Sequence, residues 1–141
     1  MVASCFWDAA CIYLHSILER MDQHCNPNVT SSLPHSWQHL ITTPKPLALS
    51  SCLSRVESVS FDLEHHCEYS ALTFPLFIAG CESETAEQRE VVMASLSVLE
   101  VSFGIGNVKR AKELLGVLWK GGVGKHWLDV LEVLQWDLIL A

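Results

Sequence analysis

The sequence is poor in charge, in closely paired cysteines and in strand-like segments. Only 18% of its 141 residues are charged, against roughly 25% in an average soluble domain. No two of its six cysteines are three residues apart, so the Cys-x-x-Cys pairs of zinc clusters are absent. No segment alternates apolar and polar residues for a useful length, which argues against the sheet-based cofactor folds. These shortages favour a helical chain without a zinc cluster.

The sequence also shows no features of a signal peptide or of a transmembrane helix. The N-terminus has no basic region, and Asp8 interrupts its first apolar run, so we expect no signal peptide. The longest apolar stretches, 71–80 and 130–141, are too short to cross a bilayer. We therefore expect a soluble intracellular protein without membrane contact. Its cysteines are then small buried apolar residues and not disulfide partners.

Apolar residues are abundant instead. They make up 50% of the chain, and the mean hydropathy is +0.26, which indicates apolar surface meant for an interaction. The net charge of −7 argues against a grip on the phosphates of nucleic acid. The length suits one domain over 1–141.

Apolar residues at three- and four-residue spacing predict a first helix over Ala3–Met21. A loop-rich connection with four prolines follows over about 22–46. Residues 47–69 are then expected to form one long helix or two joined ones. The apolar repeat of the first helix is Phe6, Ala10, Tyr13 and Ile17, with Leu14 and Leu18 beside it.

Further helices are predicted after residue 84. Thr85 and Gln88 have the spacing of a capping box, so a helix should start there and end over Gly104–Gly106. Asn107 can cap the next helix, which makes the two an antiparallel hairpin. A last apolar helix covers 127–140. The sequence thus predicts an all-α fold, an array of about six to seven antiparallel helices forming a helical-hairpin bundle.

The stretch from Leu72 to Glu82 is nearly all apolar, and we expect the rest of the chain to be organised around it. Pro75 fits the first turn of a helix, where its missing N–H costs nothing. Gly80 permits the close approach of another backbone. We predict a short, fully buried helix here.

Ordered motifs from this stretch onward resemble the C-terminal part of the fungal-specific transcription factor domain, the helical regulatory region of fungal zinc-cluster activators. They include Glu87-Gln-Arg89, Leu114-Leu115 and Gln135-Trp-Asp-Leu-Ile-Leu140. The resemblance covers Leu72–Ala141 well and the first seventy residues more loosely, so it implies a chain that begins inside that domain. It assigns the following residues to a structural core: Phe74, Pro75, Leu76, Phe77, Gly80, Cys81, Arg89, Trp119, Trp127 and Trp136.

The resemblance implies a regulatory or effector role in transcription, located in the nucleus. The expected partners are proteins of the transcription machinery or a full-length regulator, or a small-molecule effector. Without the zinc cluster we expect no direct contact with nucleic acid. A second hypothesis stays open. It is a stand-alone helical protein that binds a small apolar metabolite between the 72–81 helix and the C-terminal hairpin, or that completes its core with a partner chain.

No catalytic, cofactor or metal site is predicted. His35 and His39 are four residues apart, near His24 and Cys25, but no glutamate completes the catalytic zinc motif. The glycines of Gly121–Lys125 lack the serine or threonine of a phosphate-binding loop. We therefore expect neither an enzyme nor a cofactor.

Overall fold

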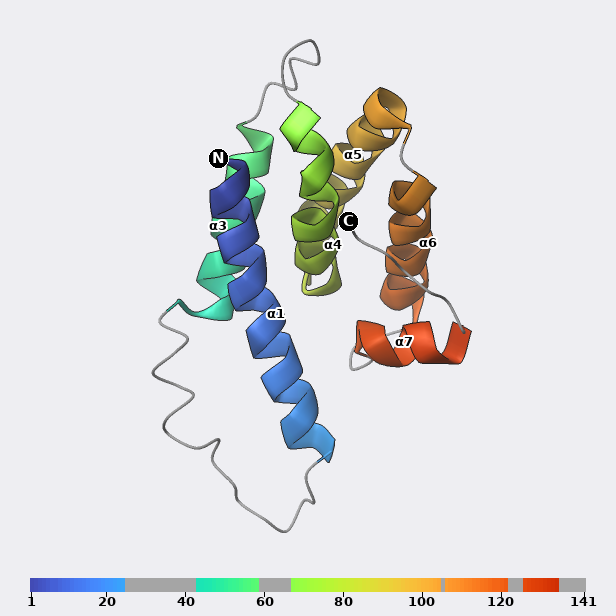
Figure 1. Ribbon diagram of the computed structural model, residues 1–141. Coiled ribbons are helices and arrows are strands. Elements are labelled where there is room, and N and C mark those ends of the chain that lie inside the picture. The colour runs from blue at the N-terminus through green and yellow to red at the C-terminus, as the bar shows by residue number, and fades with distance from the viewer. Residues whose placement is uncertain (25–42, 59–66, 105, 122–125, 135–141) are drawn as a thin grey trace.

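A computed structural model of the chain describes residues 1–24, 43–58, 67–104, 106–121 and 126–134. This part of the chain contains six α-helices and one short 3-10 helix, and no strand. The all-α prediction is confirmed. Neighbouring helices of the first five run in alternating directions (Figure 1).

The N-terminal half forms one side of the array. Helix α1 (Val2–His24) packs against α3 (Lys45–Glu57), which runs in the opposite direction. The chain then enters the 3-10 helix η1 (Cys67–Leu72), which leads directly into α4 (Thr73–Cys81). Of the one long helix or two joined helices predicted over 47–69, α3 forms the first part and residues 67–69 belong to the 3-10 segment, while residues 59–66 lie outside the described residues. Helix α3 begins earlier than predicted because Pro46 lies in its first turn, where a proline is tolerated.

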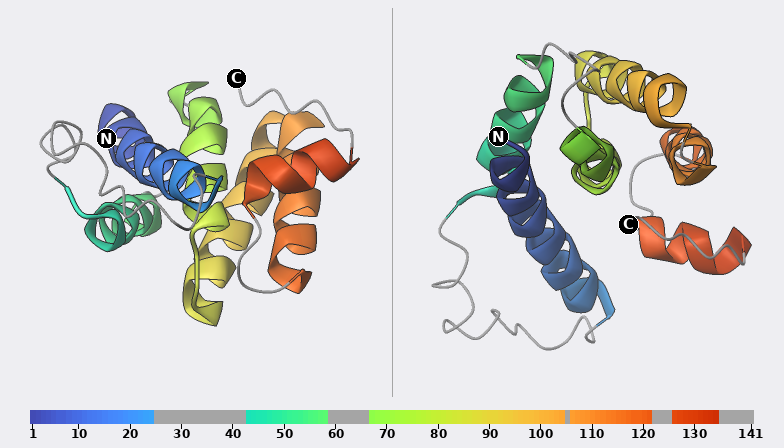
Figure 2. Two further views of the ribbon diagram at one scale, coloured as in Figure 1. Left: turned by 90° about the horizontal axis from the view of Figure 1, so that it is seen from below. Right: turned by 45° about the horizontal axis from the view of Figure 1, so that its top comes forward.

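The C-terminal half covers the other side of α4. Helices α5 (Ala86–Phe103) and α6 (Gly106–Lys120) form the predicted hairpin, and α7 (Trp127–Leu134) crosses near the end of α6 (Figures 1 and 2). Helix α4 contacts α1, α3, α5 and α6, so it is the centre of the core. The predicted extension of the last helix to residue 140 lies outside the described residues.

Both ends of α5 have the predicted chemistry. Thr85 accepts the backbone N–H of Gln88, whose side chain accepts the N–H of Thr85, so the capping box is confirmed. Gly104 ends the helix in the left-handed region at a φ of 60°, which glycine adopts without strain. The prediction for Asn107 is wrong: α6 begins at Gly106, so Asn107 lies inside its first turn.

The buried face of α1 differs from the predicted one. Ala10 and Leu14 belong to the predicted apolar repeat, yet both are exposed. Cys5, Ala9 and Ile12, which do not belong to it, are fully buried. Helix α1 is apolar around most of its circumference, so the spacing of apolar residues could not select the face that points inward.

The core is continuous from α1 to α7. No helix within the described ranges is long and apolar enough to cross a membrane. The largest side chains that are fully buried are Phe77, Ile12, Leu72, Leu76, Ile78, Leu96, Leu99, Leu114, Leu115, Val56, Val92 and Val108.

Candidate functional site

The family-motif residues of α4 lie at the centre of the core. Leu76 and Phe77 are fully buried, and Pro75 is the third residue of the helix, so its missing N–H leaves no helical hydrogen bond unmade. Phe74 is half-buried and stacks on Phe6 of α1, with ring centroids 5.8 Å apart. These four residues join α4 to α1 on one side and to the core on the other.

At Gly80, α4 packs closely against both helices of the α5–α6 hairpin. A Cβ atom at this position would lie 2.8 and 2.9 Å from the two Cδ atoms of Leu115 and 3.0 Å from Cγ1 of Val92. Real Cβ atoms do not approach other carbons so closely, so only glycine fits here without movement. The two elements are in direct contact at the place where the sequence suggested a metabolite pocket.

The C-terminal end of α4 is held by side chains from both helices of the hairpin. The Trp119 indole Nε1 donates to the backbone oxygen of Gly80 at 3.0 Å. The Arg89 guanidinium lies 5.4 Å from the centroid of the Trp119 ring, and its Nε donates to the backbone oxygen of Ser83 at 3.1 Å. Carbonyl groups at a helix end need such donors, and a cation is favourable there. Trp119 is half-buried, and the N–H at the edge of its ring is used in the hydrogen bond to α4.

The remaining family-motif residues are Cys81, Trp127 and Trp136. Trp127 of α7 is almost fully buried, and its ring meets Phe77 edge to face with centroids 5.5 Å apart. Tyr13 of α1 approaches the same indole at 6.1 Å. Cys81 is half-buried and carries a free thiol, and Trp136 lies outside the described residues.

Ser16 of α1 contacts His126, directly before α7, and no sequence pattern predicts this contact because 110 residues separate the two. Ser16 Oγ lies 2.6 Å from His126 Nε2. The other ring nitrogen, Nδ1, accepts the backbone N–H of Leu128 at 3.2 Å. The proton of the neutral ring is therefore on Nε2, which donates to the serine. A nucleophilic serine needs the reverse direction, so the pair is structural.

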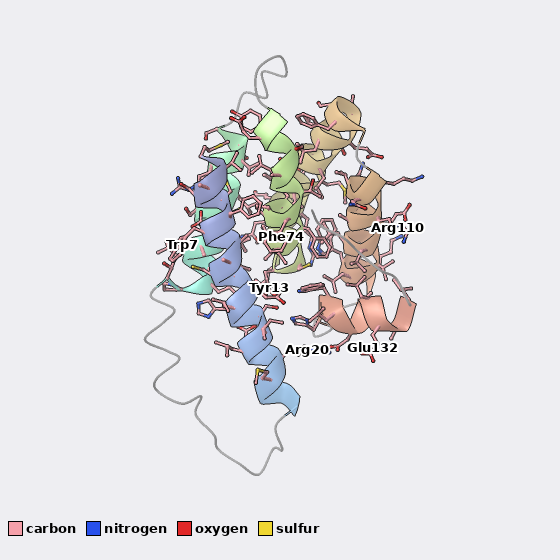
Figure 3. All side chains as sticks on the ribbon, in the orientation of Figure 1. Trp7, Tyr13, Arg20, Phe74, Arg110 and Glu132 are labelled. Carbon is pink, nitrogen blue, oxygen red and sulfur yellow. The ribbon has the colours of Figure 1, made fainter. Side chains whose placement is uncertain are left out.

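An ion pair reinforces this contact between α1 and α7. The Arg20 guanidinium donates to Oδ1 of Asp129 at 2.7 and 3.2 Å. Burial lowers the pKa of His126 below its ordinary value, and the charge of Arg20 adds to this, while Asp129 acts in the opposite direction. His126 is thus held neutral beside a cation. Figure 3 shows Tyr13 and Arg20 on the side of α1 that faces α4 and α7.

A second polar cluster joins α1 to α3. Asp8 is 7% exposed and accepts the Ser51 hydroxyl at 2.9 Å, and its carboxylate is 3.3 Å from Arg55 Nε. Cys5 and Cys52 are fully buried beside it as free thiols. A hydrogen bond to Cys5, together with burial, raises the pKa of the Cys52 thiol, which stays protonated. These groups have partners within the fold, and they join α1 to α3.

Within the described ranges no three His, Cys, Asp or Glu side chains gather in a way that could hold a metal ion. Cys25, His35 and His39 lie outside those ranges. An open hollow of about 470 Å³ lies where α3 meets α5. It is lined by Glu57, Glu87, Glu90, Val91, Ala94 and Ser95.

Comparison with known families gives the context of this helical array. The family model described as the fungal specific transcription factor domain matches residues 1–141. The chain belongs to this family. The match confirms the resemblance and includes the first seventy residues, where the motifs extended only loosely. Neither a curated protein nor a solved structure matches the chain.

Membership of the fungal specific transcription factor domain family gives the chain a role in transcription regulation. This family is one of transcription factors and not of enzymes, and such factors act in the nucleus. The contacts described above are structural, because they join α4 and α7 to their neighbours.

Proposed function

We propose that this domain is a regulatory or effector region of a fungal zinc-cluster type transcription factor, and that it works by binding a protein partner or a small-molecule effector. The observation that carries the proposal is the family match over residues 1–141. The net charge of −7 and the absence of Cys-x-x-Cys pairs support it further, since both leave DNA contact to another segment or another protein. The family match is also the reason for placing the domain in the nucleus.

A protein partner suits the surface better than a buried apolar metabolite. The helices pack directly against one another at Gly80, where α4 meets the hairpin. Large apolar side chains are instead displayed outward, including Leu47 on α3, Val117 on α6 and Val133 on α7. Exposed apolar surface of this kind is typical of protein interaction sites when it is gathered into a patch.

The test is a reporter assay in a fungal cell. The 141-residue chain is fused to an unrelated DNA-binding domain, and transcription from the matching reporter is compared with that of the DNA-binding domain alone. We expect a change in either direction. Leu76→Asp, which places a charge in the core, should abolish it, whereas Val101→Asp, on the surface, should keep it. Transcription equal to that of the DNA-binding domain alone, on both activated and basal reporters, would contradict the proposal.

A titration then distinguishes a small-molecule effector from a protein partner. A panel of small apolar metabolites is added to the purified chain while intrinsic tryptophan fluorescence is recorded. A saturable change identifies a small-molecule effector, and a flat response across the panel supports a protein partner. Leu76→Asp serves again as the control, because binding to a folded site should be lost with the fold.

A further inference from the structure

Helix α1 has a second apolar face, which points away from the core. Six apolar residues follow one another at alternating spacings of four and three, the pattern of a coiled-coil seam. Trp7, Leu14 and Met21 are 66%, 48% and 55% exposed. None of the six residues is charged or polar. We call this set the outer seam of α1, and it comprises Ala3, Trp7, Ala10, Leu14, Ile17 and Met21.

Among the described residues, the neighbours of α1 leave most of the outer seam exposed, with Ile17 half-buried. Asp8 and His15 reach towards α3, through Ser51 and the backbone oxygen of Thr43, and Tyr13 and Arg20 reach towards α7. The outer seam lies between these two flanks on the far side of the helix. In Figure 3, Trp7 lies on the side of α1 opposite to Tyr13 and Arg20, and Figure 2 shows α1 at one edge of the array.

The order of side-chain sizes along the outer seam makes it complementary to itself. The large residues Trp7, Leu14 and Met21 recur every seven positions, and smaller ones stand between them. In two antiparallel copies related by a two-fold axis near residue 12, Trp7 meets Ile17 of the other copy, Leu14 meets Ala10, and Met21 meets Ala3. Each layer then joins a larger side chain to a smaller one, as close packing requires. A parallel pairing would place Trp7 against Trp7 and leave gaps at the alanines.

We propose that a second copy of this chain covers the outer seam, with the two α1 helices antiparallel in a two-fold dimer. The proposal does not depend on the regulatory role inferred above.

The area available sets the expected strength. At 66% exposure Trp7 offers about 150 Å². With Leu14, Met21 and the smaller residues, we estimate roughly 500 Å² per copy, or roughly 1,000 Å² in total, which is near the lower limit for a specific interface. A dissociation constant on the order of 1–100 μM follows. The chain carries a net charge of −7, so two copies repel one another and added salt should strengthen the dimer.

The test is sedimentation equilibrium of the full chain over about 1–300 μM, a range set by that affinity. We expect a monomer–dimer equilibrium that tightens with salt. Leu14→Glu, at the centre of the outer seam, should raise the dissociation constant roughly a hundredfold. Val101→Glu adds the same charge at a position that is 87% exposed on α5, and it should leave the constant within about twofold of the parent value, as is usual for an independent surface site. Helicity measured by circular dichroism shows that each variant is folded, and Met21→Glu replaces Leu14→Glu if that variant is not.

The orientation is tested by a charge exchange. Ala3→Glu alone should weaken the dimer, and adding Met21→Lys in the same chain should restore it, because the two positions face each other only in the antiparallel arrangement. A chain that stays monomeric up to the highest concentration overturns the proposal. So does equal weakening by Leu14→Glu and Val101→Glu, or a dimer that neither outer-seam variant affects. Weakening by Leu14→Glu without rescue by the charge exchange overturns the antiparallel pairing.

Discussion

Replacing Gly80 by alanine should destabilise the fold, although alanine is the better helix former. Gly80 is the second-last residue of α4, and its carbonyl accepts the Trp119 indole. The added methyl group would lie 2.8 Å from Leu115 Cδ1. Leu115 is fully buried, so its side chain can move only by displacing other core residues or by pushing α6 away.

Two opposing effects decide the magnitude. Glycine to alanine within a helix gains up to about 1 kcal/mol, and less near the helix end. Overpacking a core by one methyl group costs about 1–3 kcal/mol. Gly116 of α6 supplies the matched control, because a Cβ there would meet nothing within 4 Å and Gly116→Ala should therefore show only the gain. We expect the two variants to differ by about 2 kcal/mol, or roughly 6 °C in melting temperature for a chain of this length.

The assay is urea unfolding of both variants followed by circular dichroism. A second step tests the cause, since Leu115→Ala normally costs about 2–5 kcal/mol as a cavity but should cost less when Gly80→Ala already fills part of that space. This coupling appears as a departure from additivity in a double-mutant cycle. If Gly80→Ala stabilises the chain as much as Gly116→Ala does, or if the cycle is additive, the close contact inferred at Gly80 is refuted.

Three further predictions concern single side chains. The pKa of His126 is lowered in the folded chain from its ordinary 6.5, so between the folded and unfolded pKa values the unfolded chain binds more protons. The free energy of unfolding should therefore fall as the pH falls through this window. Urea midpoints of the parent and of His126→Gln, measured across the same pH range, check this, and an identical pH profile in both would count against it. Trp119→Phe removes the donor to Gly80 but keeps most of the ring, and should cost about 1 kcal/mol, which thermal unfolding can measure. Thr85→Ala removes the cap accepting the N–H of Gln88 and should cost about 1 kcal/mol, whereas Thr85→Ser should cost much less in the same assay.

The sequence was most informative where a local rule determines the structure. The apolar run with Pro75 predicted the buried α4, and the Thr85–Gln88 spacing predicted the start of α5, because both depend on residues within a few positions of one another. Asn107 failed as a cap because α6 begins at Gly106, which makes Asn107 the second residue of the helix, and sequence rules locate a helix start only to within one or two residues.

Features set by distant residues could not be predicted. The contact of Ser16 with His126 joins residues 110 positions apart, and the half-burial of Trp119 depends on where α4 ends against α6. The choice of the inner face of α1 belongs to the same class. Its periodicity offered two apolar faces, and only tertiary contacts distinguish them.

Polar side chains of α1 explain why one of its two apolar faces is buried and the other is exposed. Turning α1 about its axis to bury the outer seam would place Trp7 and Leu14 where Cys5, Ala9 and Ile12 now pack. That rotation would remove Asp8 from Ser51 and Arg55, and Arg20 from Asp129. The contacts of Asp8, which is 7% exposed, are the larger loss, because the side chains of Arg20 and Asp129 are 28% and 42% exposed and such a pair contributes at most about 1 kcal/mol. We infer that the polar residues of α1 determine which apolar face is covered by the core, and therefore which face remains available for a second chain.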